Sequence, residues 1–103
     1  MLLLDDDDEL PTVAQPAEDQ LAQQLGEQGL RIVDAALMGH ARPSWSKVAR
    51  VVIDAVTSGG FGTTDDAVHL HVRRIGELVK VGQLEGQGNL RRPRFSEVRL
   101  PRR

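Results

Sequence analysis

Two stretches in the middle of the chain repeat apolar residues at helical spacing, and this pattern constrains the fold more than any other feature. Each stretch repeats at intervals of four, three and four residues, which places one apolar stripe along a helix. In the first stretch, the repeating residues are Trp45, Ala49, Val52 and Val56. In the second, they are Val68, Val72, Ile75 and Val79. We expect two amphipathic helices that pack through these stripes, with Trp45 in the core.

The ends of both predicted helices carry residues that commonly start or stop a helix. Ser44 can accept a hydrogen bond from a free backbone N–H, so we expect it to be the N-cap of the first. Thr63 lies three residues before Asp66, as in a capping box at the start of the second. Gly82 supplies its stop. The glycine-rich stretch "SGGFGTT" between them is predicted to be a flexible turn.

A third helical region precedes these two. Pro16 suits a helix start, and the leucines at positions 21 and 25 can share one helical face. Further apolar residues follow at helical spacing up to Leu37. Gly26 and Gly29 weaken the segment, and we expect the helix to fray or break there.

The C-terminal segments "QLEGQG" and "FSEVRL" are predicted to pair as a β-hairpin. If Gly86 lies opposite Val98, then Glu85 lies opposite Arg99, and opposite charges across a strand pair stabilise it. The tip then spans residues 89–94. Three helices followed by a hairpin predict a mostly α fold of winged helix-turn-helix-like type, with a three-helix core and a C-terminal wing over residues 17–103.

Charge is divided unevenly along the chain. Residues 1–30 contain eight acidic and no basic residues, whereas residues 31–103 contain thirteen basic and seven acidic residues, which gives −2 overall. The run "DDDDE" at residues 5–9 is typical of a solvated, disordered segment. We therefore expect residues 1–16 to form an acidic disordered arm.

Several functional classes are disfavoured. The chain has no Cys, which removes thiolate catalysis and Cys-based zinc sites and suits a cytoplasmic protein. His69 and His71 lie two apart and point to different sides of a helix, so no metal site is expected. No nucleophile, base and orienting residue can be assembled, so we predict no enzyme, no cofactor and no small-molecule substrate. No apolar run approaches the ~20 residues of a membrane span, and no signal peptide is expected.

The C-terminal arginines carry the strongest functional signal. Guanidinium groups bind phosphates and carboxylates bidentately, and Phe95, predicted to point outward beside Arg94, could stack on a base or anchor a protein partner. It could equally fold over the outer face of the hairpin. The candidate contact residues are Arg73, Arg74, Arg91, Arg92, Arg94, Phe95, Arg102 and Arg103.

Two functions follow from this layout. The favoured one is a regulatory or interaction module that binds a protein through the winged-helix surface. The alternative is nucleic-acid binding through the basic wing, which the acidic arm could fold back over and mask. Asp65 and Asp66 count against the alternative, because they stand at the helix end that normally leads into the major groove.

The chain also resembles a bacterial domain family of unassigned function. The resemblance rests on "WSKVARVVIDAV" and "HVRRIGELVKVGQLEGQGNLRRPRFSEVRLP", which carry the patterns W-x-x-V-A-x-V, R-x-x-x-L-V-x-x-G-x-L-E-x-x-G and a final E-V-R-L-P. It covers about residues 30–101 and implies a fold of winged-helix type. In that family the unit often follows a larger domain. The shared residues are structural, so the resemblance implies no catalytic residue.

Overall fold

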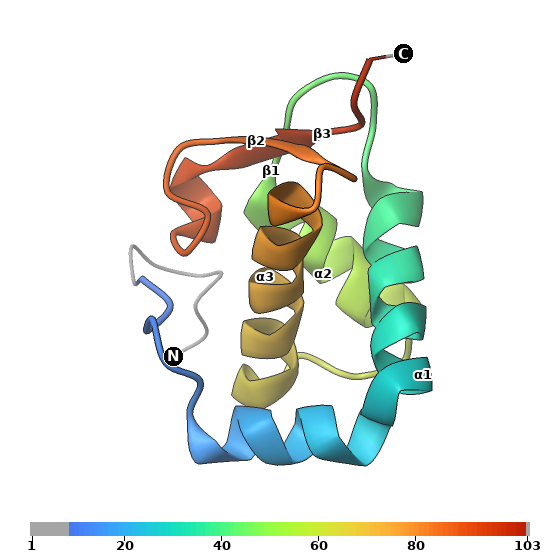
Figure 1. Ribbon diagram of the computed structural model, residues 1–103, viewed down its shortest axis with the longest axis vertical. Coiled ribbons are helices and arrows are strands. Elements are labelled where there is room, and N and C mark those ends of the chain that lie inside the picture. The colour runs from blue at the N-terminus through green and yellow to red at the C-terminus, as the bar shows by residue number, and fades with distance from the viewer. Residues whose placement is uncertain (1–8, 103) are drawn as a thin grey trace.

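The computed structural model describes residues 9–102 as a helical core with a small sheet at one end (Figure 1). The described helices are α1 (Pro16–His40), α2 (Val48–Ser58) and α3 (Asp65–Lys80). The strands are β1 (Ser46–Lys47), β2 (Glu85–Gln87) and β3 (Glu97–Arg99), with a 3-10 turn η1 (Pro93–Phe95) before β3. The predicted class, a mostly helical core with a small β wing, is confirmed. None of the helices between residues 9 and 102 is long and apolar enough to cross a membrane.

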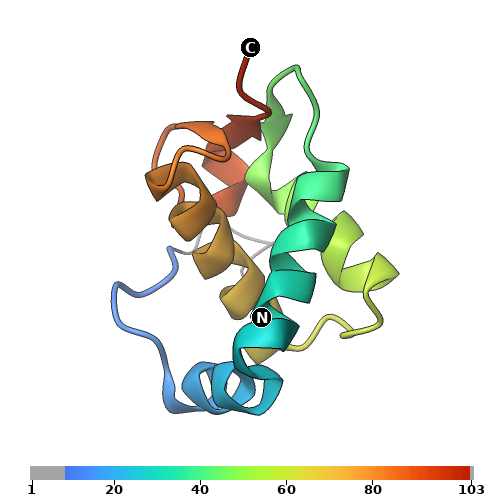
Figure 2. The same cartoon turned by 45° about the vertical axis from the view of Figure 1, so that its right-hand side comes forward.

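Helix α1 bends sharply at Gly26, which confirms the predicted break at this residue. Gly26 has φ 66° and ψ −174°, a backbone conformation that glycine adopts without the steric cost of a Cβ. The part of α1 before the bend lies across the N-terminal end of α3, and the part after it runs beside α3 and α2 (Figures 1 and 2). The bend therefore brings the start of α1 back to α3.

Helix α2 begins later than predicted. Ser46 and Lys47 form strand β1, and Lys47 rather than Ser44 is the N-cap, so the prediction of a Ser44 cap is wrong. The reason is tertiary, because β1 pairs with β3 and the Val48 N–H donates to the Ser96 carbonyl at 3.0 Å. Trp45 therefore precedes the helix. The buried residues of α2 are Val48, Val51, Val52, Ala55 and Val56.

Trp45 lies at the edge of the sheet, half-buried, and the guanidinium of Arg99 stands over its ring at 4.3 Å. The prediction that Trp45 starts the buried stripe of a helix is therefore wrong. Its ring instead covers one side of a charged side chain on β3.

Helix α3 follows its predicted stripe closely, since Val68, Val72 and Ile75 are buried. It begins after Thr64, whose side chain makes no capping hydrogen bond, so the predicted capping box starting at Thr63 is wrong. The predicted stop at Gly82 is confirmed. Gly82 has φ 82°, and the hydrogen bond from its N–H to the Val79 carbonyl, 3.0 Å, closes the last turn.

The sheet has the order β1-β3-β2 and is antiparallel throughout. The predicted hairpin is β2 with β3, and its pairing is confirmed, because Gly86 lies opposite Val98 and Glu85 opposite Arg99. Arg99 Nε donates to Glu85 Oε1 at 2.6 Å. The third strand, β1, was not predicted.

The core combines residues of all three helices and of the wing with one residue from outside them. The apolar cluster contains Val33 of α1, Val52 of α2 and Val72 of α3, together with Leu84 and Val98 of the wing. The unexpected member is Leu10, which precedes α1 and is 1% exposed.

Candidate functional site

The N-terminal arm is the first part of the candidate site. Residues 1–8 lie outside the described residues, and the predicted disorder there stays a prediction. Residues 9–15 contain neither helix nor strand, and they lie beside α3 between the wing and the start of α1 (Figure 1). Here the structure shows a defined path instead of the expected disorder, because Leu10 is fully buried. We call residues 9–12 the arm segment.

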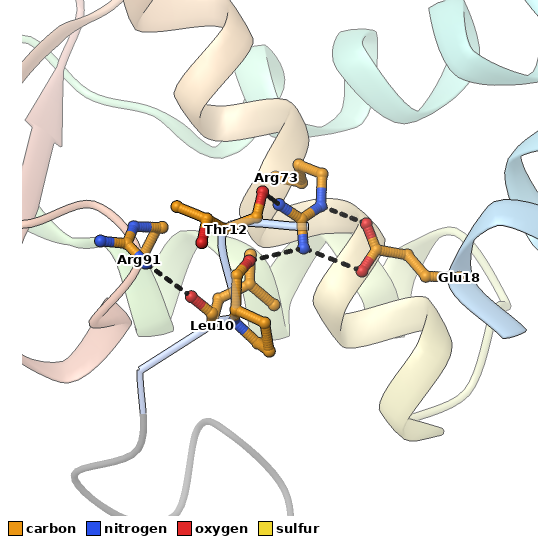
Figure 3. Close-up of polar contacts among 6 residues, drawn as sticks. Leu10, Thr12, Glu18, Arg73 and Arg91 are labelled. Carbon is orange, nitrogen blue, oxygen red and sulfur yellow. Dashed lines mark hydrogen bonds and ion pairs between the residues drawn. The ribbon is translucent and has the colours of Figure 1, made fainter. Parts of the chain in front are cut away.

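The arm segment binds the loop at the tip of the wing through its backbone. The Leu10 N–H donates to the Arg91 carbonyl at 2.7 Å. In return, Arg91 Nη1 donates to the Leu10 carbonyl at 3.2 Å (Figure 3). Leu10 is thus held by both of its backbone polar groups, while its side chain joins the core.

The acidic side chain before Leu10 is bound by the same loop. Arg91 Nη2 lies 2.7 Å from Glu9 Oε2, and Asn89 Nδ2 donates to the same oxygen at 3.2 Å. The Arg91 and Glu9 side chains are 40% and 42% exposed. Water screens a pair this exposed, so it contributes little stability on its own.

Arg73 on α3 binds the other end of the arm segment. Its Nη2 donates to the Pro11 carbonyl at 3.0 Å, and its Nη1 donates to the Thr12 carbonyl at 3.3 Å. The same guanidinium donates to both carboxylate oxygens of Glu18 on α1 (Figure 3). Glu18 is 2% exposed, and a buried carboxylate needs such a partner to compensate for lost hydration.

Arg74 is also held inside the molecule. Its Nε and Nη2 donate to the two carboxylate oxygens of Asp34 on α1 at 2.9 and 2.8 Å. The hydrogen bonds to Asp34 raise the pKa of Arg74 and fix its charge in this fork. Both candidate contact residues of α3 therefore tie α3 to α1.

The tip of the wing presents the remaining candidates. Phe95 is 51% exposed, and the Arg92 guanidinium lies over its ring at 4.8 Å. Pro93, the first residue of η1, is buried, and the Ser96 hydroxyl donates to the Arg92 carbonyl at 2.9 Å, so the turn is anchored at both ends. Arg94 is exposed beside Phe95.

The C-terminal candidates lie away from this tip. Arg102 is exposed, and Arg103 lies outside the described residues. The Leu100 N–H donates to the Arg42 carbonyl at 2.7 Å, which places the C-terminal tail beside the loop between α1 and β1. Arg102 is therefore part of a different surface from Arg91 and Arg92.

That loop belongs to a basic surface that the sequence reasoning missed. A groove of about 300 Å³ is lined by His40, Arg42, Ser46, Lys47, Arg50, Val51 and Asp54. Arg50 Nε lies 3.3 Å from Asp54 Oδ2, whereas Arg42 and Lys47 are exposed and form no ion pair with any described residue. These side chains come from the end of α1, the loop after it, β1 and the first turns of α2, and no sequence motif marks them.

His71 is a fully buried residue of α3. Its Nδ1 donates to the Ala67 carbonyl at 2.7 Å, and its ring meets Phe61 edge-on at 5.2 Å. Nε2 has no hydrogen-bond partner among the described residues. Burial lowers the pKa of His71 from its ordinary value of 6.5 and so favours the neutral ring. Within residues 9–102, no three His, Asp or Glu side chains are grouped to hold a metal ion.

Comparisons with protein-family models, with curated proteins and with solved structures find no significant match. The resemblance to a bacterial domain family stays a prediction.

Proposed function

We propose that this chain is a small, non-enzymatic interaction module of winged-helix type that binds a protein partner through the tip of its wing. One observation carries the proposal. The arm segment covers the side of α3 that faces the wing tip, and the arginines of α3 are bound by acids of α1. The surface that a helix-turn-helix protein turns toward DNA is thus occupied by the chain itself.

The charges of α3 support the same conclusion. A recognition helix enters the major groove with its N-terminal residues leading. In α3 these residues are Asp65 and Asp66, which stabilise the helix end but would repel phosphates. The first part of α1 also lies across this end (Figure 1). Arg73 and Arg74 cannot offset the acids without leaving Glu18 and Asp34 unpaired.

The wing tip has the chemistry of a protein-contact surface. Aromatic and arginine side chains dominate the binding energy of many protein interfaces. Phe95 with Arg92 over its ring forms such a pair, and the 3-10 turn that carries Phe95 begins at the buried Pro93. An aromatic side chain that is already ordered loses little entropy when a partner covers it.

The test is co-purification of a partner from a nuclease-treated bacterial lysate with tagged wild-type chain and variants. A specific partner should be recovered with wild type and lost with Phe95→Ala. Val81→Ala is the matched control, because Val81 is 65% exposed at the end of α3 and lies outside the wing tip. Equal recovery with all three proteins would remove Phe95 from the contact surface.

Nucleic-acid binding remains the second candidate, and Arg42 and Lys47, which form no ion pair within residues 9–102, favour it. Titration of duplex DNA at ~50 mM salt, where phosphate contacts are strongest, tests it directly. If the arm masks a DNA-binding wing, Leu10→Asp should strengthen binding. If the groove beside β1 binds DNA, Arg42→Gln with Lys47→Gln should weaken it. No binding by any of these proteins would exclude this function.

A further inference from the structure

We propose that the face between α3 and the wing tip is a peptide-binding site that the chain's own arm segment fills. Its ligand in trans is a non-helical segment of a partner protein with an acidic residue directly before a leucine. We call Arg73, Asn89, Arg91 and the apolar surroundings of Leu10 the arm site. This inference goes beyond the proposed function, because it concerns a different surface from that of Phe95.

Most of the hydrogen bonds in the arm site reach the backbone of the bound segment. Three consecutive carbonyls, of Leu10, Pro11 and Thr12, each accept from a guanidinium at 3.0 to 3.3 Å. The Leu10 N–H donates to the Arg91 carbonyl. Such main-chain contacts, combined with one side-chain pocket, are how extended peptides are commonly recognised. They require a backbone that follows the path of residues 9–12 and little specific sequence.

The side-chain contacts define which segment fits. The Leu10 side chain is 1% exposed and belongs to the core cluster, so the site selects an apolar side chain of this size. Asn89 and Arg91 both bind the Glu9 carboxylate, so an acid is selected at the preceding position. Val13 is 76% exposed, and the site does not select at its position.

The site keeps its shape when the arm segment leaves. Glu18 belongs to α1 and not to the arm, and its bonds to Nε and Nη2 of Arg73 hold that guanidinium in place. The segment itself is attached more loosely, because the Glu9–Arg91 pair is about 40% exposed and residues 11–13 are exposed. Leu10 is the one fully buried side chain of residues 9–13, so the segment opens at about the cost of exposing a leucine, roughly 2 kcal/mol. Because the arm site is formed without the arm segment, a segment of another protein can replace the arm there.

A partner protein fits the trans occupant better than a second copy of this chain. A tethered arm acts at an effective concentration on the order of millimolar. The identical arm of a second copy makes no additional contact and competes only at similar concentrations. A partner with the same acidic-leucine core can add contacts outside the arm site and displace the arm at lower concentration.

The experiment measures binding of a fluorescent peptide of residues 5–15, DDDDELPTVAQ, to the full chain by anisotropy. Wild type should bind weakly, since its own arm competes. Leu10→Ala in the protein should tighten peptide binding by about ten-fold or more, because the cis competitor is weakened. Glu9→Gln should tighten it by a smaller factor, about two- to five-fold, because its ion pair with Arg91 is half-exposed. Arg91→Gln added to Leu10→Ala should remove that gain, and a peptide with Leu10→Asp should not bind.

Equal binding of both peptides, or no gain in either protein variant, would overturn the proposal. If the wild-type chain is a dimer and Leu10→Asp makes it a monomer, the arm of a second copy fills the site. That result would overturn the assignment of a partner protein as the ligand. Glu9→Gln changes only a half-exposed side chain, so it keeps the test valid if Leu10→Ala unfolds the chain. Failure here leaves the proposed function standing, because co-purification with Phe95→Ala does not involve the arm site.

Discussion

Two groups of basic side chains in this molecule differ in what surrounds their charge. On the arm side, Arg73 and Arg91 each bind a carboxylate and at least one backbone carbonyl of the arm segment. On the sheet side, Arg42 and Lys47 line a groove without an acidic partner among the described residues. The first group holds the fold together, and the second leaves its charge open to solvent or a ligand.

The comparison shows why counting arginines along a sequence is a weak guide to a binding surface. The C-terminal cluster stood out because its arginines are adjacent in the chain. In the structure, the ion pairs of Arg91 and Arg99 are made within the molecule. Arg42 and Lys47 lie five residues apart in a stretch with no arginine cluster. Their charges are nevertheless less neutralised by acidic side chains than those of Arg91 and Arg99.

The largest expected effect is on stability, when the buried ion pair of the arm side is broken. Arg73→Ala leaves Glu18, 2% exposed, without its partner, and we expect the free energy of unfolding to fall by about 3 kcal/mol. The matched change Lys47→Ala on the sheet side should alter it by less than about 0.5 kcal/mol. Urea denaturation compares the two, and similar losses would contradict the distinction.

Next in size is the loss of the Leu10 side chain. Leu10→Ala removes a fully buried group, and we expect a loss of about 2 kcal/mol, the low end for such changes, because the arm can partly close the gap. Val13→Ala, three residues along the same arm, should cost under about 0.5 kcal/mol, since Val13 is 76% exposed. Thermal unfolding followed by circular dichroism measures both, and an unaffected Leu10→Ala would mean that the arm is not packed.

His71 is a third case, because it is a buried base that forms no ion pair with any described acidic side chain. Burial lowers its pKa in the folded state, so below pH 6.5 the unfolded chain binds a proton that the folded chain does not. Stability should therefore fall as pH decreases through 6.5, by up to about 1.4 kcal/mol per pH unit from this group.

Urea midpoints at pH 7.5 and 5.5 measure this dependence. His71→Leu should flatten it, and His69→Gln, a change two residues away on α3, should leave it in place. A pH dependence unchanged in His71→Leu would assign it to other groups.

The smallest effect on stability, and the clearest on polyanion binding, belongs to the sheet side. Arg42→Gln with Lys47→Gln should leave the unfolding free energy within about 0.5 kcal/mol of wild type. It should elute from heparin at lower salt, because two exposed charges are lost. Arg74→Gln removes a charge already paired with Asp34 and should shift elution less. If Arg74→Gln lowers the elution salt more than the double variant does, the polyanion-binding surface includes Arg74 and not the groove beside β1.

The parts of the fold that could be predicted are those governed by local periodicity and by one cross-strand pair. The stripe of α3 follows from the spacing of Val68, Val72 and Ile75, and the hairpin pairing from Glu85 opposite Arg99. The bend at Gly26 follows from the permissive backbone of glycine.

The start of α2 could not be predicted, because Trp45 continues the helical period of the residues after it. Strand β1 has two residues and forms through its pairing with β3, some fifty residues later in the chain. The spacing of apolar residues predicts local secondary structure, but it does not predict strand pairing between distant parts of the chain.

The arm side was hidden for a related reason. Leu10 stands alone between an acidic run and a proline, without a periodic neighbour, so nothing in the sequence marks it as buried. Glu18 and Arg73 are 55 positions apart, and their contact depends on how α1 bends back to α3. The predicted candidates Arg73 and Arg91 were found by charge, whereas their partners Glu18 and Leu10 were not.

Hydrogen exchange at the Leu10 amide tests most directly whether the arm segment lies against the wing tip. This N–H donates to the Arg91 carbonyl at 2.7 Å beneath a buried side chain. In the full chain, it should exchange at least about 100-fold more slowly than in an unstructured peptide, and Leu10→Asp should abolish the corresponding protection at position 10. Exchange of the wild-type Leu10 amide at the unstructured rate would contradict the account.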